Sequence, residues 1–286
     1  MALFRPKKLN RSMGGNLLVF LVLGLFAVFQ MIPIVYTIGS AFKPVSELLK
    51  MPPTIFPRRF TTESFSELFI SMSASRIVFS RYIFNSFFVT VCGVVMTIVL
   101  CSLAAYPLAK MHGMPGAKFL GWFIILAMML SSDVSGMATF MIQTGLRIID
   151  TPWSIILPSI GSAFSVFLLK QFMEQMVPDT LIEAAKIDGA GEFLVWGRIV
   201  LPVMKPAVLT LIIFSMQWLW NNDGSRIFSE QRKILPNAMR QIVDGGIARL
   251  GVAAAVGVFI MVVPITLFII LQSNVIETMA TSGIKD

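Results

Sequence analysis

Five side chains in or beside strongly apolar segments are candidates for contacting a polar solute: Asp133, Asn85, Gln217, Trp220 and Asn221. A tryptophan ring can stack on the apolar face of a sugar, and an asparagine amide both donates and accepts hydrogen bonds. Polar side chains are costly in lipid and rarely face it, so they mark a pathway or a contact between helices. The chemistry they favour is non-covalent binding of a polar molecule inside a helix bundle.

Each candidate also has a structural interpretation. Asp133 lies in the sequence SSDVSG, which either unwinds a helix along a pathway or places the carboxylate at a wetted or paired helix end. Trp220 and Asn221 either meet the solute or form an interfacial aromatic anchor with a solvated turn. Asn85, followed by Ser86, also suits a helix end or a hydrogen bond between helices.

Patterns for covalent chemistry are not found. The sequence has no Gly-x-x-x-x-Gly-Lys-Ser/Thr loop for a nucleotide phosphate and no apparent Ser/His/Asp or paired-acid arrangement. His112 is the only histidine and lies in a short polar loop, so no metal site is predicted. Cys92 and Cys101 fall in one predicted helix about 13 Å apart, too far for a disulfide. We therefore expect neither an enzyme nor a chain that binds its own cofactor.

The composition is typical of a helical membrane protein, because 56% of the residues are hydrophobic and only 13% are charged. A hydrocarbon core about 30 Å thick needs roughly 20 mostly apolar residues in helix. Membrane β-barrels would show alternating apolar and polar residues, whereas the apolar windows here are continuous. We predict an all-α polytopic membrane protein with six transmembrane helices, from windows at residues 12–42, 82–109, 119–146, 151–169, 206–222 and 250–276.

The windows also define an organisation along the chain. In order, we expect a cytoplasmic basic tail, a first transmembrane helix, an extracytoplasmic proline-rich loop, a five-helix core and a cytoplasmic C-terminal tail, at residues 1–11, 12–42, 43–81, 82–276 and 277–286. The basic tail places both termini in the cytoplasm, although two outer loops also carry basic residues. The net charge of +8 fits contact with anionic lipid, and no basic stripe interleaved with aromatics suggests nucleic acid.

The loop between the fourth and fifth windows, residues 170–205, is predicted to be structured. Thr180 and Glu183 form a Ser/Thr-x-x-Glu capping box, so a helix should start near Thr180. Gly189 or Gly191 can end it in the left-handed conformation, and a second short helix is predicted at residues 193–200. Two short helices joined by a glycine turn would make a compact knob on the membrane surface.

The spacing within this loop is distinctive. Residues 183–202 read EAAKIDGAGEFLVWGRIVLP: Glu-Ala-Ala, three residues, Gly, nine residues, then Ile-x-Leu-Pro. This resembles the cytoplasmic coupling loop of ABC-importer permeases, and all seven defined positions match. Taken alone, Glu-Ala-Ala would be an ordinary amphipathic helix start; the full spacing between two apolar windows favours the coupling loop.

The resemblance implies the type I ABC importer permease fold and a knob that docks on a separate ATPase. Glu183 would bond to the ATPase surface, and Gly189 would permit the sharp turn. The residues assigned to this coupling are Glu183, Ala184, Ala185, Asp188, Gly189, Ile199, Leu201 and Pro202.

Features elsewhere resemble the carbohydrate-importer branch of these permeases, the maltose-type branch. They include FKP, PP and FP in the outer loop at residues 42–44, 52–53 and 56–57, and the Trp220-Asn221 pair. The resemblance implies a binding-protein-dependent inner membrane component that forms half of the pathway for a sugar or oligosaccharide. Alternatives are an importer of a non-sugar solute, an ion-coupled secondary transporter or a membrane scaffold.

The resemblance also implies partners in the bacterial cell membrane. These are a second, homologous permease subunit forming a heterodimer, two copies of a cytoplasmic ABC ATPase that hold ATP and Mg, an extracytoplasmic solute-binding protein, the sugar substrate and membrane lipid.

Overall fold

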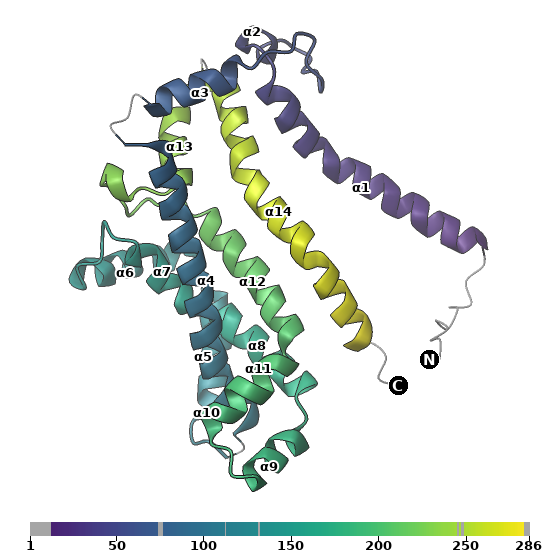
Figure 1. The fold of residues 1–286 in the computed structure, drawn as a ribbon, viewed down its shortest axis with the longest axis vertical. Coiled ribbons are helices and arrows are strands. Elements are labelled where there is room, and N and C mark those ends of the chain that lie inside the picture. Colours follow the sequence, from purple (N-terminus) through teal and green to yellow (C-terminus); the bar gives the residue numbers. More distant parts are fainter. Residues whose placement is uncertain are drawn as a thin grey trace. The chain divides into compact units, whose positions relative to one another are not determined.

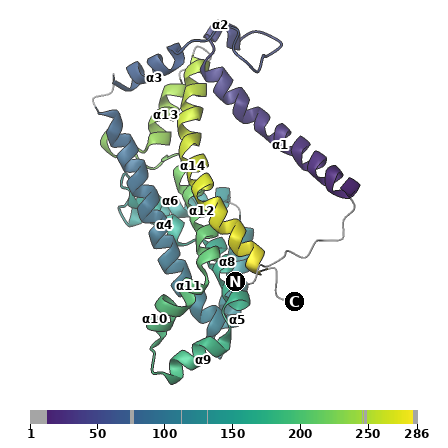
Figure 2. The ribbon, with the colours of Figure 1, turned by 45° about the vertical axis from the view of Figure 1, so that its right-hand side comes forward.

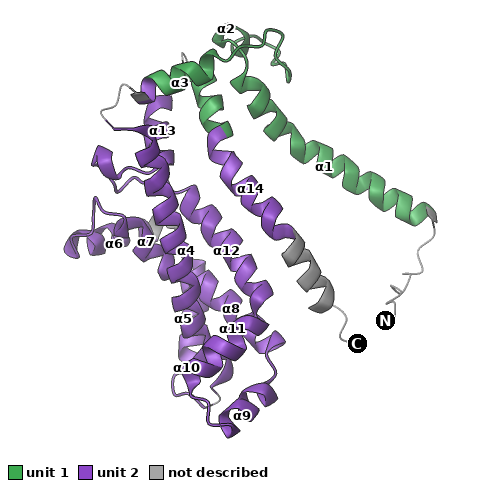
Figure 3. Ribbon diagram, viewed as in Figure 1, with its two compact units in different colours: residues 1–70, 245–258 green, residues 71–244, 259–286 purple. Residues whose placement is uncertain are grey.

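The structure is a computed structural model and describes residues 13–73, 77–111, 113–130, 132–244, 246 and 249–282. Across these ranges the regular elements are all helical (Figure 1), which confirms the predicted all-α class. The chain divides into two compact units, residues 1–70 with 245–258 and residues 71–244 with 259–286 (Figure 3).

The first unit contains α1 (Met13–Ala41), an apolar helix of 29 residues. None of its most hydrophobic window is buried within the chain. A helix that is apolar on every side needs lipid or protein around it, so α1 is suited to the membrane. The helices α2 (Val45–Leu48) and α3 (Glu63–Ser73) follow in the predicted proline-rich loop.

The second unit is organised around α4 (Phe79–Lys110), a single helix of 32 residues. Its buried residues recur every three or four positions, so one stripe of the helix faces the core. This stripe packs against three helices: α7 (Trp153–Ile160), α8 (Ala163–Met176) and α12 (Lys205–Trp220). Gly93 permits the close crossing with α12, because a Cβ there would lie 2.6 Å from Leu219 Cδ1.

The remaining elements are short apart from the last helix. They are α5 (Ala117–Met129), α6 (Ser132–Gly145), α9 (Asp179–Ile187), α10 (Glu192–Val195), the π-helix η1 (Trp196–Val200), α11 (Leu201–Val203), the 3₁₀ turn η2 (Glu230–Arg232), α13 (Leu235–Val243) and α14 (Leu250–Ser282).

Within the described residues, four helices are long and apolar enough to cross a membrane: Gly14–Ala41, Phe79–Lys110, Trp153–Met176 and Leu250–Gln272. A fifth crossing is possible if Glu192–Val203 and Lys205–Trp220, which meet at a bend of 82°, form one span. The predicted number of six therefore stays a prediction.

The third predicted window, residues 119–146, is divided between α5 and α6. The 13 residues of α5 extend about 20 Å, less than the thickness of the hydrocarbon core. Asp133 lies in the first turn of α6, but its side chain is outside the described part of the structure, as are the tail at residues 1–11 and His112.

Candidate functional site

The predicted knob is a compact projection at one end of the second unit. We define the knob as residues 178–203, which contain α9, α10, η1 and α11 (Figure 2). The chain then turns sharply into α12, so the knob and α12 are continuous in sequence. Only Met204 lies between the end of the knob and the start of α12.

Gly189 makes the turn between the two helical parts of the knob. Its φ is +82°, a left-handed conformation that favours glycine. The Ala190 N–H donates to the Ala185 carbonyl at 2.9 Å, and the Gly189 N–H donates to the Lys186 carbonyl at 3.0 Å. This pair of hydrogen bonds is the Schellman motif that ends α9. Gly191 instead has a φ of −72°, so the left-handed role belongs to Gly189.

The start of α9 differs from the predicted capping box. The helix begins at Asp179, its N-cap position is Pro178, and no side chain caps it. Asp179 instead forms an ion pair with Lys110 Nζ at 2.8 Å. The first residue of the helix is thus tied to α4, and Glu183 is exposed on the helix surface.

One face of the knob is anchored in the bundle. Ile182, Ala185, Val195 and Val200 are buried in an apolar cluster with residues of α4, α8 and α12. Ile199 is partly buried and packs against this cluster, Leu201 is partly buried, and Pro202 is exposed. The anchored face holds the knob firmly against the helices that continue into the membrane.

The opposite face of the knob is apolar and exposed. Ile187 is 86% exposed and Phe193 is 79% exposed, with Leu181 and Leu194 exposed near them in sequence. Ala184 and Asp188 are also exposed. Large apolar side chains gathered on one small projection are typical of a surface that binds another protein.

Polar contacts tie the knob to the end of α4. The Tyr106 hydroxyl donates to Glu192 Oε2 at 2.6 Å, and Lys186 Nζ pairs with Glu192 Oε1 at 2.7 Å. Lys110 Nζ donates to the Val177 carbonyl at 2.6 Å as well as to Asp179. The Lys186 ammonium, and then the Tyr106 hydroxyl, hold the pKa of Glu192 below its ordinary value. Glu192 is therefore a charged acceptor shared by the knob and α4.

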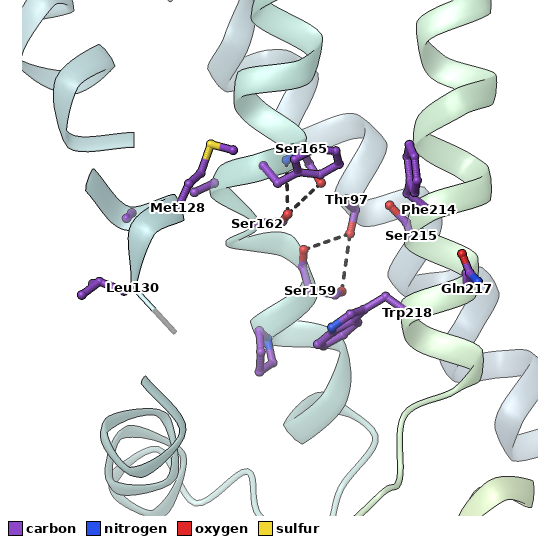
Figure 4. Close-up of a pocket in the computed structure, with 14 residues that line it drawn as sticks. Thr97, Met128, Leu130, Ser159, Ser162, Ser165, Phe214, Ser215, Gln217 and Trp218 are labelled. Atoms are coloured by element: carbon purple, nitrogen blue, oxygen red, sulfur yellow. Dashed lines mark hydrogen bonds between the residues drawn. The ribbon is translucent and has the colours of Figure 1, made fainter. Parts of the chain in front are cut away.

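A second candidate site is a cavity of about 770 Å³ within the second unit (Figure 4). Four parts of the chain line it, and they contribute hydroxyls, an amide and aromatic rings. The described residues that line this bundle cavity are Thr97, Ala127, Met128, Leu130, Pro158, Ser159, Ser162, Ala163, Phe164, Ser165, Phe214, Ser215, Gln217 and Trp218.

The hydroxyls of the bundle cavity gather where α7 ends and α8 begins. Ser162 caps α8, accepting from the Ser165 N–H at 3.2 Å and from its hydroxyl at 2.8 Å. From α4, Thr97 Oγ1 lies 3.3 Å from the Ser159 carbonyl oxygen and 3.4 Å from its hydroxyl (Figure 4). Hydroxyls beside the rings of Phe164, Phe214 and Trp218 make a surface suited to a polar solute with apolar faces.

The predicted pathway residues lie in different surroundings, and only one of the four described below lines the cavity. Gln217 lines the bundle cavity. Trp220 is buried, and its indole N–H donates to the Ile260 carbonyl at 2.9 Å. The Asn221 amide donates to the Gln217 carbonyl at the end of α12. The Asn85 amide donates to the Gln231 and Lys233 carbonyls, both at 2.9 Å.

Trp218 is the aromatic residue that the sequence analysis missed. It lines the bundle cavity and is 51% exposed, whereas Trp220 faces the packed side of the same helix. The helical repeat places Trp218 on the face of Phe214 and Ser215, four and three residues earlier. That spacing could have indicated that the three residues share a face, but not that this face lines a cavity, which depends on how α12 packs.

No group of three or more His, Cys, Asp or Glu side chains could hold a metal ion among the residues that the structure describes.

Comparison with known proteins gives a consistent classification, although no profile of a known protein family matches the chain. The crystal structure of a bacterial ABC transporter that imports alginate has a chain with a TM-score of 0.74 and 19% identity, covering 92% of this chain and 98% of that one. The fold is thus shared with a chain of an ABC importer.

Similar sequences narrow the class. YtcP of Bacillus subtilis, a polygalacturonan/rhamnogalacturonan transport system permease protein, is 30% identical over 206 residues, 72% of this chain and 69% of its own length. AraQ, the arabinooligosaccharides permease protein of the same bacterium, is 27% identical over 273 residues, 94% of each chain. LplC, also from Bacillus subtilis, is 33% identical over 202 residues, 71% of this chain but only 65% of LplC.

The chain belongs to the permease subunits of carbohydrate-importing ABC transporters. It is a multi-pass protein of the bacterial inner membrane in a family of transport proteins, not of enzymes.

Proposed function

We propose that this chain forms half of the translocation pathway for a sugar or oligosaccharide and takes its driving force from a cytoplasmic ATPase through the knob. The carrying observation is the construction of the knob. One face is packed into the bundle, and the other presents exposed Ile187 and Phe193. Gly189 makes the turn between the two helical parts of the knob. A rigid, one-sided projection of this kind transmits a push instead of absorbing it.

The partners follow from this role. We propose that a homologous permease subunit completes the pathway as a heterodimer and that two copies of an ABC ATPase hold ATP and Mg, none of which this chain binds itself. An extracytoplasmic solute-binding protein would deliver the sugar. A solved alginate ABC transporter in complex with an alginate pentasaccharide-bound periplasmic protein, with a TM-score of 0.59 over 89% of this chain, supports this assembly. Both termini would then lie in the cytoplasm, on the side of the knob.

The ATPase-coupling role is assigned within the knob. Exposed Glu183, Ala184 and Asp188 lie on α9 and at its end, where a docked ATPase would reach them, whereas Ala185 is buried. The small side chain of exposed Ala184 allows close approach of a partner surface, whereas Ala185 packs into the anchored face. Ile199, Leu201 and Pro202 lie in the last part of the knob, just before α12, where they would pass motion to the bundle.

We propose that the bundle cavity is this subunit's part of the sugar pathway. Serine and threonine hydroxyls can exchange hydrogen bonds with sugar hydroxyls, and Trp218 can stack on a sugar ring. None of the described residues lining the cavity is charged, which suits a neutral polyol better than an ion. Of the residues that the sequence suggested for the pathway, Gln217 lines the cavity directly and keeps this role in the proposal.

A pair of glycine variants tests the coupling role. Gly189 and Gly191 are both exposed, and nothing lies within 4 Å of a Cβ built on either. Gly189→Val forces valine into a left-handed conformation at about 1–2 kcal/mol, whereas Gly191→Val meets an ordinary extended backbone. In proteoliposomes holding the whole importer, we expect Gly189→Val to lower ATP-driven uptake about tenfold, equivalent to about 1.4 kcal/mol.

Gly191→Val should retain uptake close to that of the unmodified importer. If both variants purify as intact complexes and take up sugar at the same rate, the conformation of Gly189 in the knob is not needed for coupling, which contradicts the proposed role. ATP-independent uptake driven by an ion gradient would contradict the proposed function itself.

A further inference from the structure

The helix α4 is held by polar contacts at both of its ends, and the two ends serve different parts of the chain. Figures 1 and 2 both show α9 and α10 near one end of α4 and α13 near the other. All of these elements belong to the second unit. We call residues 229–243, which include η2 and α13, the outer segment.

The contacts at the knob end form the inner latch: Ser102, Tyr106 and Lys110 of α4. Tyr106 holds Glu192, Lys110 holds Asp179 and the Val177 carbonyl, and Ser102 accepts from the Trp196 indole N–H at 3.3 Å. Lys110 is 9% exposed and Tyr106 is 3% exposed. Since charge-assisted hydrogen bonds are about twice as strong as neutral ones, this latch resists separation of the knob from α4.

The contacts at the other end form the outer latch: Tyr82, Asn85 and Ser86. The Leu235 N–H, at the start of α13, donates to Ser86 Oγ at 2.6 Å. Asn85 donates to two carbonyls of the outer segment, and the Tyr82 hydroxyl lies 3.2 Å from Glu230 Oε2. Ser86 thus caps a helix that is 149 residues away in sequence, and Asn85 holds the chain leading into it.

The distance between the latches matches a membrane. Ser86 and Tyr106 are separated by twenty residues of continuous helix, which extends about 30 Å, the thickness of the hydrocarbon core. Between the latches α4 is packed against α7, α8 and α12. A continuous helix packed along its length behaves as a stiff element and does not absorb displacement at one end.

We propose that α4 is a strut whose latches, Tyr106 with Lys110 at one end and Asn85 with Ser86 at the other, transmit displacement of the knob to the outer segment. The inference rests on the proposed function, because it assumes that the ATPase moves the knob. It gives Asn85 a positioning role in place of direct contact with the solute. The outer segment in turn is the part of the chain whose position reports the state of the ATPase.

The test is hydrogen exchange of the outer segment, read by mass spectrometry on the purified importer complex with and without trapping by Mg-ATP and vanadate. In the unmodified complex we expect exchange in residues 229–243 to change about fivefold or more on trapping, the low end of ordinary coupling energies. Tyr106→Phe removes one hydroxyl at the opposite latch, and it should reduce this change to less than about twofold.

Ser86→Ala separates a positioning role from a purely local one. The strut predicts that this variant raises exchange of the outer segment and also abolishes its response to trapping. A merely structural role would raise exchange equally in both states and leave the response intact, which would overturn the proposal. Ser80→Ala, at an exposed serine in the first turn of α4, is the matched control and should leave the response unchanged.

The double variant Tyr106→Phe with Ser86→Ala provides a second criterion. Opening either latch breaks one path, so the double variant should respond no less than either single variant. Responses that fall independently and additively would show two unrelated contacts and contradict the strut. Different results would contradict the proposed function and the strut. If the unmodified importer shows no ATP-driven uptake, the proposed function is wrong. If uptake is normal but the exchange response of the outer segment is unaltered in Tyr106→Phe, only the strut is refuted.

Discussion

The knob and the bundle cavity are built in opposite ways. The knob comes from one continuous stretch, residues 178–203, and its central turn is set by a single backbone conformation at Gly189. The bundle cavity is assembled from four stretches, with Thr97, Met128, Ser162 and Trp218 brought together only by packing. A locally determined part can keep its shape while its surroundings move, whereas a part made by packing changes shape when the helices shift. The first property suits a lever, and the second suits a passage that must open and close.

The largest effect expected from this contrast is at the crossing of α4 and α12. Gly93→Val would place side-chain atoms against Leu219, where even a Cβ would lie 2.6 Å from Cδ1. Overpacking of this kind costs about 1–3 kcal/mol or more. We expect a lower thermal unfolding temperature of the purified complex and faster hydrogen exchange at residues 155–165, beside the bundle cavity.

Exchange within the knob should rise much less in Gly93→Val. Equal increases in both regions would show that the knob also depends on distant packing, and the contrast would not stand.

The next effect concerns the attachment of the knob. Asp179→Ala leaves the Lys110 ammonium, whose side chain is 5% exposed, with the Val177 carbonyl as a remaining acceptor. Loss of a partner from a buried charged group costs about 1–3 kcal/mol, so we expect destabilisation of about 1–2 kcal/mol because Asp179 is itself half exposed. Chemical denaturation of the detergent-solubilised complex would measure it.

Glu174→Ala is the matched control for Asp179→Ala. It removes an ion pair of similar length, Lys170 to Glu174 at 2.7 Å, on the surface of α8. Exposed pairs one helical turn apart contribute about 0.3–0.5 kcal/mol, so this control should be nearly silent. A control that is as harmful as Asp179→Ala would mean that burial of Lys110 does not matter.

A smaller effect is expected for single side chains of the bundle cavity. Gln217→Ala should raise the KM for sugar uptake about two- to tenfold, the equivalent of one lost hydrogen bond. Asn221→Ala, whose amide bonds to the Gln217 carbonyl at the helix end, should leave KM unchanged. If Asn221→Ala raised the KM and Gln217→Ala did not, the solute would contact the end of α12 and not the cavity.

The smallest effect concerns pH. The pKa of Glu192 is lowered from 4.5, mainly by Lys186 and then by Tyr106. A lowered carboxylate pKa stabilises the folded protein above the unfolded value, and this contribution is lost as pH falls through the folded value. Acidification below about pH 4.5 should therefore loosen the knob in the unmodified complex, as followed by its hydrogen exchange.

Glu192→Gln should remove that part of the pH dependence and make the knob equally loose at neutral pH. An unchanged acid response in Glu192→Gln would assign the titration to another group.

The same contrast explains what the sequence could predict. The glycine turn was predictable because the Schellman motif depends on a few consecutive residues. Four of the apolar windows were predictable as long helices because length and composition alone indicate a membrane helix, but the division of the window at residues 119–146 was not. The contact of Tyr106 with Glu192 joins positions 86 residues apart, and no local pattern indicates it. The helix start near Thr180 was predicted correctly, but the capping box was not, because the N-cap position is Pro178 and Asp179 pairs with Lys110 of α4.

Rotation of a helix about its axis was the hardest property to predict. In α12, Trp218 and Trp220 differ by two residues, about 200° around the helix, so one lines the bundle cavity while the other is buried. Sequence composition favours both tryptophans equally. The choice is made by long-range packing, including the hydrogen bond from Trp220 to Ile260.

The exposed apolar side chains of the knob have a consequence before any transport takes place. In the proposed orientation, a newly inserted copy displays Ile187 and Phe193 to water until its motor arrives. Such a surface binds other apolar surfaces, so copies of this subunit in excess over the ATPase would aggregate or be degraded by proteases. Production of the ATPase would then limit how much of the permease the cell can accumulate safely.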